Sequence, residues 1–316
     1  MAQYLLRRGG QSVVLLLLVS FIGFGILHLA PGGPLSQLVQ SASMSPDDIA
    51  RLTRQMGLDR PFLGQYADWL ARMVTGDWGA SYRDGMPVLR KIGGHIQPTL
   101  ELMLFSTVVA AVLGCGIGIW GAVRRHSLMD VLSSVGAMVA LSIPTFWFGL
   151  MAIYLFAIEL RWFPSGNRGT IGDGSLADTL YHLVLPVMVL ALVETAIWAQ
   201  LMRASMIETL QQDFIRTARA KGLSGRSVVW SHALRNSLLP MITLLGLQFP
   251  ALLGGALVTE TVFSWPGMGR LFVDSLEYRD YPVVMGILLL SAIMVMLGSL
   301  LADLLYAIAD PRIRID

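Results

Sequence analysis

The chain has 316 residues, of which 54% are hydrophobic and only 14% are charged, and its formal net charge is +2. Soluble globular proteins carry about 25% charged residues, so this composition, with a mean hydropathy of +0.63, indicates a membrane protein. The near balance of charge argues against a nucleic-acid-binding protein with a large basic surface, and the single cysteine, Cys115, excludes an intrachain disulfide and a multi-cysteine metal site.

Six apolar stretches predict transmembrane helices, because a spanning helix needs about 20 mostly apolar residues. They lie near residues 11–30, 99–122, 131–158, 182–203, 238–258 and 282–307. We interpret the first as a retained span and not a signal peptide, since its apolar run is long and Pro31 follows Ala30 at the expected cleavage point. The sequence therefore predicts an all-α integral membrane protein with six spans in one domain, residues 1–316.

The placement of arginine and lysine predicts that both termini are cytoplasmic, because short inner connections of membrane proteins are enriched in these residues. Arg7 and Arg8 precede the first span, and Arg124 and Arg125 follow the second. The connection between the fourth and fifth spans, residues 204–237, is the most basic of the short connections. We therefore expect that connection to face the cytoplasm.

The segment between the first two spans, residues 31–98, is expected to be extracytoplasmic and to contain helices of its own. Ser45 followed by Pro46 is typical of a helix start, and Gly57 is placed to end that helix. A second helix is predicted from Pro61 to Gly76, with an apolar stripe at helical spacing. The stripe consists of Leu63, Tyr66, Leu70 and Val74. The segment fits either a compact cap or a docking surface for a delivery protein.

Motifs of common enzymes are missing from the sequence. It contains neither an H-E-x-x-H zinc motif nor a G-x-S-x-G elbow, and neither of its two lysines, Lys91 and Lys221, belongs to a phosphate-binding loop. We therefore expect that this chain is not an enzyme and that any ATP it depends on is hydrolysed by another protein.

Ionisable residues inside the spans are the next candidates for function, because they are costly in a membrane. Glu194 is the clearest, in the middle of the fourth span, and His28, Glu101 and Asp303 lie nearer to span ends. Glu194 fits two interpretations equally: a polar group at a helix contact or aqueous cavity, or a residue of a substrate pathway.

The basic connection contains the pattern of a short helix. Asp213 is a good N-cap residue, the run FIRTARAK contains no helix breaker, and Gly222 is placed to terminate the helix beside Lys221. A helix of about two turns is marginal on its own in water, so we expect it to pack on another surface. Thr217, Ala218 and Ala220 would keep it slim enough to enter a groove, with Phe214 and Ile215 as apolar anchors.

The segment ARAKGLSGRSVVWSHALRNSLLP, residues 218–240, resembles the cytoplasmic signature loop of ATP-binding-cassette (ABC) importer permeases of the dipeptide, oligopeptide and nickel branch. Further motifs of that branch follow along the chain, among them MGLDRPF at 56–62, SIPTFWFG at 142–149, TETVFSWPGMGRL at 259–271 and DLLYAIADPRIR at 303–314. The sequence departs from the general signature of such permeases, which begins with Glu-Ala-Ala. Here that slot reads Arg216-Thr217-Ala218, and the interval from Gly222 to Pro240 is longer.

The resemblance implies the type I ABC importer permease fold and a coupling helix that docks on a cytoplasmic ATPase. The implied partners are a second, similar permease subunit, two ATPase subunits, an extracytoplasmic solute-binding protein and the lipid bilayer, with no nucleic acid. ATP and magnesium would be bound by the ATPase subunits, and no cofactor or metal by this chain. The candidate coupling residues are Asp213, Phe214, Ile215, Arg216, Ala218, Arg219, Ala220, Lys221, Gly222 and Leu223.

A second candidate region lies near the start of the last span. Pro266-Gly267 forces a turn, and Phe263 and Trp265 are expected to anchor it at the membrane interface. We interpret this turn, together with Glu194, as a candidate gate or translocation path, and a simple amphipathic turn is the alternative.

The leading hypothesis is therefore an importer permease in the bacterial inner membrane for peptides or similar small polar solutes. An ion-gradient-driven secondary carrier is the main alternative, and an intramembrane enzyme is a second.

Overall fold

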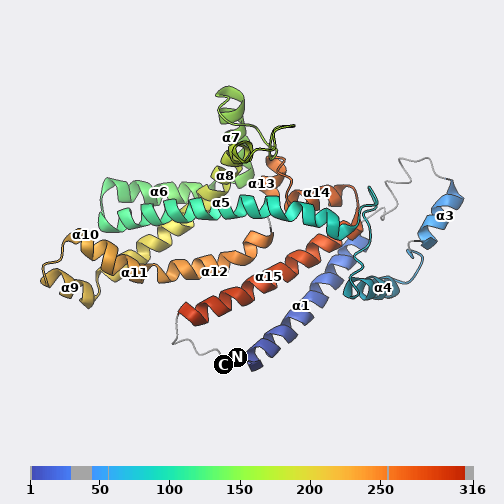
Figure 1. Ribbon diagram of the computed structural model, residues 1–316, viewed down its shortest axis with the longest axis horizontal. Helices are drawn as coiled ribbons and strands as arrows, with labels where there is room; N and C mark the ends of the chain where they lie inside the picture. Colours follow the sequence, from blue (N-terminus) through green and yellow to red (C-terminus); the bar gives the residue numbers. More distant parts are fainter. Residues whose placement is uncertain (1, 30–44, 56, 255, 310–316) are drawn as a thin grey trace.

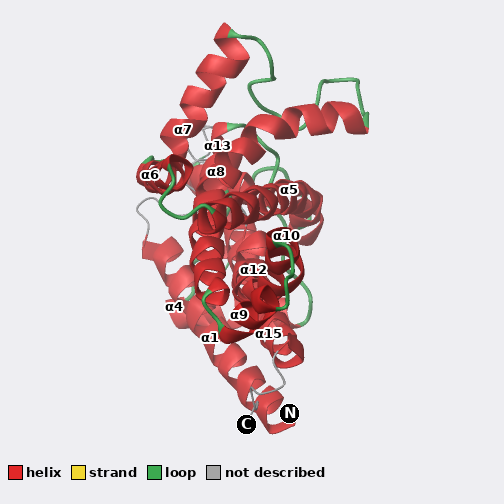
Figure 2. Cartoon of the chain, turned by 90° about the vertical axis from the view of Figure 1, so that its left-hand side faces the viewer, coloured by secondary structure: helices red, strands yellow, loops and turns green. Residues whose placement is uncertain are grey.

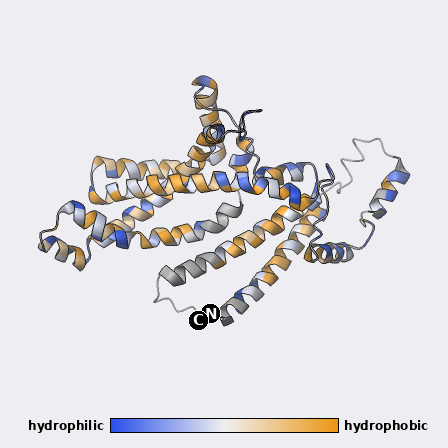
Figure 3. Ribbon diagram, in the orientation of Figure 1, coloured by the Kyte–Doolittle hydropathy of each residue, from blue (hydrophilic) through white to orange (hydrophobic). Residues whose placement is uncertain are grey.

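The computed structural model describes residues 2–29, 45–55, 57–254 and 256–309, which form helices joined by turns and loops (Figures 1 and 2). Within these ranges no β-strand occurs, and one isolated β-bridge joins Ala80 to Pro87. The long helices are mostly hydrophobic (Figure 3). The expected all-α membrane architecture is confirmed.

In the part of the chain that the structure describes, four helices are individually long and apolar enough to cross a membrane. They are α1 (Ala2–Leu29), α5 (Val88–Val123), α8 (Leu176–Leu210) and α15 (Tyr281–Ala309). With 36 and 35 residues, α5 and α8 are each about 50 Å long at 1.5 Å per residue, against a hydrocarbon core of roughly 30 Å. Both begin well before the expected spans 99–122 and 182–203, so they extend beyond the membrane.

The most extensive helix contact in the fold is that between α5 and α8. Two glycines of α5 make it possible, since a Cβ atom at Gly114 would lie 2.4 Å from the Trp198 Cβ, and one at Gly118 would lie 2.6 Å from the Ala199 carbonyl oxygen. Small residues let transmembrane helices approach closely. The packing of α8 on α5 therefore depends on glycine at these positions.

The third predicted span, residues 131–158, is not one continuous helix. It consists of α6 (Leu128–Ser142), α7 (Thr145–Ala152) and the π-helix η1 (Ile153–Glu159), with a bend of 100° after α6. Pro144 explains the break, because proline cannot donate a helical hydrogen bond and disfavours helical dihedrals at the residue before it. Ile143 accordingly has extended dihedrals, φ −84° and ψ 125°.

The fifth predicted span, residues 238–258, corresponds to α12 (Leu239–Gly254), which has 16 residues and packs along α15. It is shorter than the about 20 residues expected of a complete span. Among the described residues, the six predicted spans thus appear as four single helices, one bent pair and one short helix.

Two helices of the predicted extracytoplasmic segment lie at one end of the long axis (Figure 1). They are α3 (Pro46–Gln55) and α4 (Phe62–Val74). Ser45 Oγ accepts a hydrogen bond from the Asp48 backbone amide at 3.2 Å, and Gly57 has φ +67° after α3, so both predicted end signals are confirmed.

The expected apolar stripe of α4 is only partly buried within the chain, because Tyr66 packs on the core whereas other members do not. Leu63 and Val74 are 67% and 81% exposed. The face that packs on α1 contains Phe62, Tyr66 and Trp69, and the Tyr66 hydroxyl lies 2.9 Å from Ser20 Oγ of α1. The predicted helical spacing is correct. The inward face of α4, however, is the one whose aromatic side chains pack on α1 and α15.

The remaining helices are short. α9 (Asp213–Ala220), α10 (Gly225–Ser227), the π-helix η2 (Val228–Ala233) and α11 (Leu234–Ser237) form the connection between α8 and α12. α13 (Leu257–Val262) and α14 (Met268–Glu277) precede α15. Along the long axis, α9 and α10 lie at the end opposite α3 and α4 (Figure 1).

Candidate functional site

The short helix predicted in the basic connection is α9, which follows α8 after a tight turn. The predicted N-cap, Asp213, is wrong by one position. Gln212 is the N-cap, without a side-chain cap bond, because the turn after α8 leaves Gln212 extended and Asp213 already helical. Asp213 instead receives a hydrogen bond from Arg216 Nη1 at 3.4 Å, and an acid in the first turn still interacts favourably with the helix dipole.

The opposite end of α9 is closed as the sequence predicts. Gly222 has φ +79°, and its amide donates to the Arg219 carbonyl oxygen at 2.9 Å. The Leu223 amide donates back to the Ala218 carbonyl oxygen at 3.4 Å. This pair of bonds is the Schellman arrangement, which favours glycine at the left-handed position.

The two faces of α9 differ. Ile215 is fully buried and Ala218 is 6% exposed, and both belong to the hydrophobic cluster that includes Met202 and Met206 of α8. The expectation that Ala218 and Ile215 would face a partner is therefore wrong, because they attach α9 to this chain. The exposed residues of the predicted set are Asp213, Phe214, Arg216, Arg219, Ala220, Lys221, Gly222 and Leu223.

Apolar side chains are exposed beside these basic groups. Phe214 is 43% exposed, Leu223 40% and Trp230, in η2, 56%. Trp230 was missed among the candidate residues, and its local signal was weak, since Val228 and Val229 precede it and only Ser231 and His232 follow it directly. This end of the molecule therefore presents three apolar side chains among Arg219, Lys221 and their neighbours.

Hydrogen bonds fix the returning segment onto α8. Ser205 Oγ donates to the Ser237 carbonyl oxygen at 3.1 Å, and Ser237 Oγ lies 3.0 Å from Thr209 Oγ1. Ser237 is fully buried. The connection between α8 and α12 is thus attached to α8 both through the core beneath α9 and through this serine.

Glu194 lies in the middle of α8, as expected. Its Oε2 atom is buried and has no hydrogen-bond partner among the described residues, and the same is true of Thr107 Oγ1 on α5. Buried polar atoms without partners are rare in folded proteins. Thr107 is nonetheless close enough to interact with the Glu194 carboxyl, so the two side chains form a polar pair across the α5–α8 contact.

The predicted gate residues lie in the turn between α13 and α14, but they are not interface anchors. Phe263 is 1% exposed and Trp265 is fully buried. Trp265 Nε1 donates to the Pro98 carbonyl oxygen at 2.8 Å. The interface assignment of Phe263 and Trp265 is therefore wrong, because α5 and α8 pack around the Trp265 ring, and α7, η1 and α8 pack around the Phe263 ring.

A carboxylate that the sequence reasoning missed holds this turn together. Glu260 is fully buried, accepts a hydrogen bond from Thr99 Oγ1 at 2.8 Å and another from the Arg270 amide at 3.0 Å. A Cβ atom at Gly267 would lie 2.3 Å from its carboxyl carbon. The side chain of any residue larger than glycine at position 267 would collide with the Glu260 carboxyl group. The Pro266-Gly267 pair therefore packs directly against this buried acid. In the sequence, the available signal for this role was the position of Glu260, an acidic residue within the apolar run that directly precedes TVFSW.

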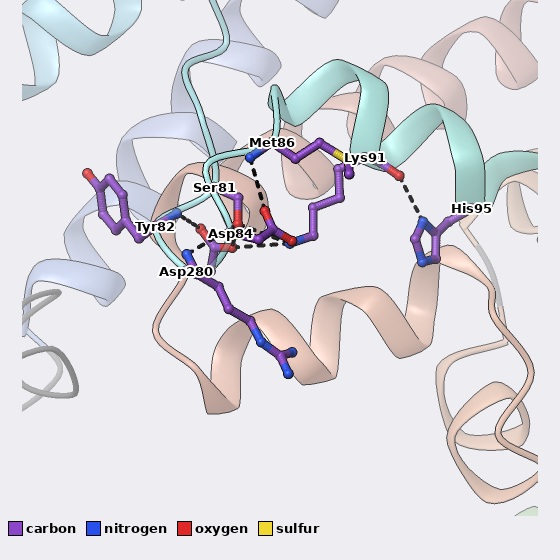
Figure 4. A network of polar contacts seen from close by, with 8 residues as sticks. Ser81, Tyr82, Asp84, Met86, Lys91, His95 and Asp280 are labelled. Atoms are coloured by element: carbon purple, nitrogen blue, oxygen red, sulfur yellow. Dashed lines mark hydrogen bonds and ion pairs between the residues drawn. The ribbon is translucent and has the colours of Figure 1, made fainter. Parts of the chain in front are cut away.

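A second missed carboxylate, Asp280, ties the segment before α5 to the start of α15 (Figure 4). It is 1% exposed and accepts hydrogen bonds from Ser81 Oγ at 2.5 Å and the Tyr82 amide at 2.9 Å. Lys91 Nζ lies 3.8 Å from Asp280 and donates to Asp84 at 2.7 Å. The hydrogen bond from Lys91 lowers the pKa of the Asp84 carboxyl to about 2, and the Met86 amide acts in the same direction.

The other ionisable residues named from the sequence have structural partners or lie outside the description. His28 bridges the Phe24 carbonyl oxygen and Gln65 Oε1, each at 2.9 Å. Glu101 accepts two hydrogen bonds from Arg168, at 2.9 and 2.7 Å. The side chain of Asp303 is outside the described part of the chain, as are residues 310–316 with Arg312 and Arg314.

Comparison with protein families identifies the fold and the class. Residues 114–315 match the family described as the binding-protein-dependent transport system inner membrane component, and residues 1–97 match the N-terminal family of such membrane components. The chain belongs to this family. The permease is therefore a transport component and not an enzyme, and its family implies a solute-binding protein and an ATPase as partners. An independent ion-driven carrier is not favoured.

Curated relatives cover the whole permease. It is 42% identical to the oligopeptide transport system permease protein AppB of Bacillus subtilis (strain 168), across 99% of this chain and 100% of the relative. It is 37% identical to the dipeptide transport system permease protein DppB of Escherichia coli (strain K12), across 99% of both chains. The di/tripeptide transport system permease protein DppB of Pseudomonas aeruginosa (strain UCBPP-PA14) has the same identity and the same coverage.

A solved structure shares the fold. The crystal structure of an amino acid ABC transporter with histidines matches with a TM-score of 0.50 and 16% identity, over 68% of this chain and 92% of that one. The expected ABC importer permease fold is thereby confirmed.

Proposed function

We propose that the permease forms a translocation path for dipeptides or oligopeptides together with a second, similar permease subunit. Two ATPase subunits would bind ATP and magnesium and supply the energy, and a solute-binding protein would deliver the peptide. The substrate class is supported by the names of relatives that cover the full chain. Both termini and α9 would lie on the cytoplasmic side, in line with the basic residues there.

The observation that carries this proposal is the construction of α9. Its inner face is anchored by Ile215, and its outer face leaves Phe214 and Leu223 exposed. An apolar side chain exposed to water is an unfavourable arrangement that a partner surface can relieve. Arg219 and Lys221 add positive charge next to these anchors, so the complementary surface would be an apolar groove with a carboxylate rim.

The test compares two glycines of this connection. An added Cβ meets nothing within 4 Å at Gly222 or at Gly225, but Gly222 has φ +79°. Gly222→Val therefore strains the end of α9, whereas Gly225→Val does not. We expect Gly222→Val to abolish uptake and to remove the stimulation of ATP hydrolysis by the binding protein, with Gly225→Val close to wild type.

Wild-type uptake and stimulated ATP hydrolysis in Gly222→Val would contradict the coupling role of α9. Purification of the permease from its native membrane tests the proposed assembly separately. Recovery of this chain without ATPase subunits would contradict it.

Glu194 is proposed as a contact for the ammonium group of a peptide, because Oε2 is buried without a partner in the described structure. Glu194→Gln is expected to reduce uptake of peptides with a free amino terminus and to leave the yield of the complex unchanged. Glu208→Gln, an exposed position near the end of the same helix, is the matched control. Equal uptake by both variants would remove this role for Glu194.

A further inference from the structure

A cavity lies at the α4 end of the described residues, between α1, α4 and the start of α15. It has a volume of about 670 Å³, which lies within the range typical of small-molecule sites, about 300–1,000 Å³. The family assignment and the proposed peptide path give this cavity no role, and none of the candidate residues of the coupling helix or gate lines it.

The inner walls of the cavity are aromatic. Phe24 from α1, Trp69 from α4, Trp78 from the following loop and Tyr281 from α15 all contribute. The rings of Phe24 and Trp69 lie 5.8 Å apart. Aromatic side chains of this kind concentrate where a membrane meets water, and Phe24 lies near the end of a helix that is apolar enough to span the membrane. We therefore expect the cavity to lie at the level of lipid headgroups.

The rim of the cavity carries positive charge that the protein does not neutralise. Arg54 and Arg72 both line it, and among the described residues neither forms an ion pair. Each donates one hydrogen bond from Nε to a backbone carbonyl, Arg54 to Ala50 at 3.2 Å and Arg72 to Asp68 at 3.4 Å. Their Nη groups are therefore available for an anion. Arg60, also on the rim, is paired with Asp68.

One polar atom of a wall residue does not face the cavity. Tyr281 lines the wall, but its hydroxyl is closed off from solvent and has no hydrogen-bond partner among the described residues. The arginines of the rim are therefore the groups that indicate a polar ligand.

We propose that this cavity binds the headgroup of an anionic phospholipid from the leaflet at the α4 end. Arg54 and Arg72 hold the phosphate, and the aromatic walls contact the glycerol region. The acyl chains continue along α1, where Ile22, Ile26 and Leu29 are 55%, 63% and 85% exposed. Three arginines and two aspartates line the cavity, so one excess positive charge favours an anionic over a zwitterionic lipid.

The test uses tryptophan quenching by dibrominated lipids, with the full chain purified into nanodiscs. Trp69 and Trp78 line the cavity and report on it. We expect stronger quenching by dibrominated phosphatidylglycerol than by dibrominated phosphatidylcholine at equal low mole fraction. Trp78→Phe is expected to remove part of that difference, which assigns the signal to this cavity.

Arginine variants test the charge contribution. Arg72→Gln is expected to weaken the preference for phosphatidylglycerol about five-fold, which corresponds to about 1 kcal/mol per basic residue near an anionic surface. Arg51→Gln is the control, because Arg51 is exposed on α3, is paired with Asp48 and does not line the cavity. Tyr281→Phe keeps the ring and removes the hydroxyl, and is expected to leave the preference unchanged, because that hydroxyl is closed off from the cavity.

Three results would overturn the lipid assignment. The first is equal quenching by the two dibrominated lipids in the wild-type chain, and the second is an equal effect of Arg72→Gln and Arg51→Gln. The third is loss of quenching on addition of inorganic phosphate or a dipeptide, which would identify a free anion or a peptide as the occupant. None of these results bears on the coupling role of α9.

Discussion

Replacing Gly118 with alanine is expected to force α5 and α8 apart. The Cβ atom added there would lie 2.6 Å from the Ala199 carbonyl oxygen, 2.7 Å from the Met202 Cβ and 2.9 Å from the Arg203 amide nitrogen. Two of these neighbours are backbone atoms, which cannot rotate away. The two helices must therefore shift along their whole contact.

The size of the effect follows from a comparison with Gly116 on the same helix. An added Cβ at Gly116 meets nothing within 4 Å, so both substitutions change the helix propensity alike and differ only in the clash. Overpacking a tight contact costs about 1–3 kcal/mol. At roughly 2 °C per kcal/mol for a chain of this length, Gly118→Ala should unfold roughly 2–6 °C below Gly116→Ala.

The assay is thermal unfolding of the purified chain in one detergent, followed by the loss of the monodisperse peak in size-exclusion chromatography. Two controls are run beside it, the wild-type chain and Gly116→Ala. If the two alanine variants unfold at the same temperature, the helices do not approach at Gly118 as closely as described, and the explanation of the α5–α8 contact is wrong.

Two further predictions concern the opposite end of the molecule. Trp265→Phe replaces the buried indole with a smaller ring and removes the hydrogen bond to the Pro98 carbonyl oxygen, so it should cost about 1–3 kcal/mol in the free energy of unfolding; an unchanged unfolding temperature would contradict the buried position of the turn. The pKa of Asp84 is lowered to about 2 by Lys91, so its contribution to stability is complete above about pH 4, near the ordinary carboxyl pKa, and is lost as the pH falls toward 2. The unfolding temperature of Asp84→Asn should therefore fall less than that of wild type over this range, and parallel curves would show that the ion pair has no role.

Sequence signals correctly predicted those features of the site that depend only on residues next to one another in the chain. The end of α9 followed from Gly222, because a left-handed residue after a helix is specified by one amino acid. The start of α9 was misplaced by one residue, since the turn from α8 and not the side chain of Asp213 determines it. The bend after α6 had a local signal in Pro144, but the unbroken hydrophobicity around it favoured one continuous helix.

Contacts between distant segments could not be predicted. Glu260 is bonded to Thr99 and Asp280 to Ser81, and neither pairing has a pattern in the sequence. The burial of Trp265 depends in the same way on α5. Apolar residues of a membrane protein face either lipid or neighbouring helices, and hydrophobicity does not distinguish the two.

The attachment of the α8–α12 connection to α8 has a mechanical consequence. Because Ser237 and the core beneath α9 join this connection to α8, and Gly118 brings α5 close to Ala199, a rigid α8 that tilted against α5 would act as a lever with its fulcrum near Ala199. Leu210 lies about 16 Å from the fulcrum on one side and Glu194 about 7 Å on the other, at 1.5 Å per residue. A tilt of about 10° would move the α9 end by about 3 Å and Glu194 by about 1 Å in the opposite direction. A displacement of α9 would thus produce a smaller displacement of Glu194 in the opposite direction.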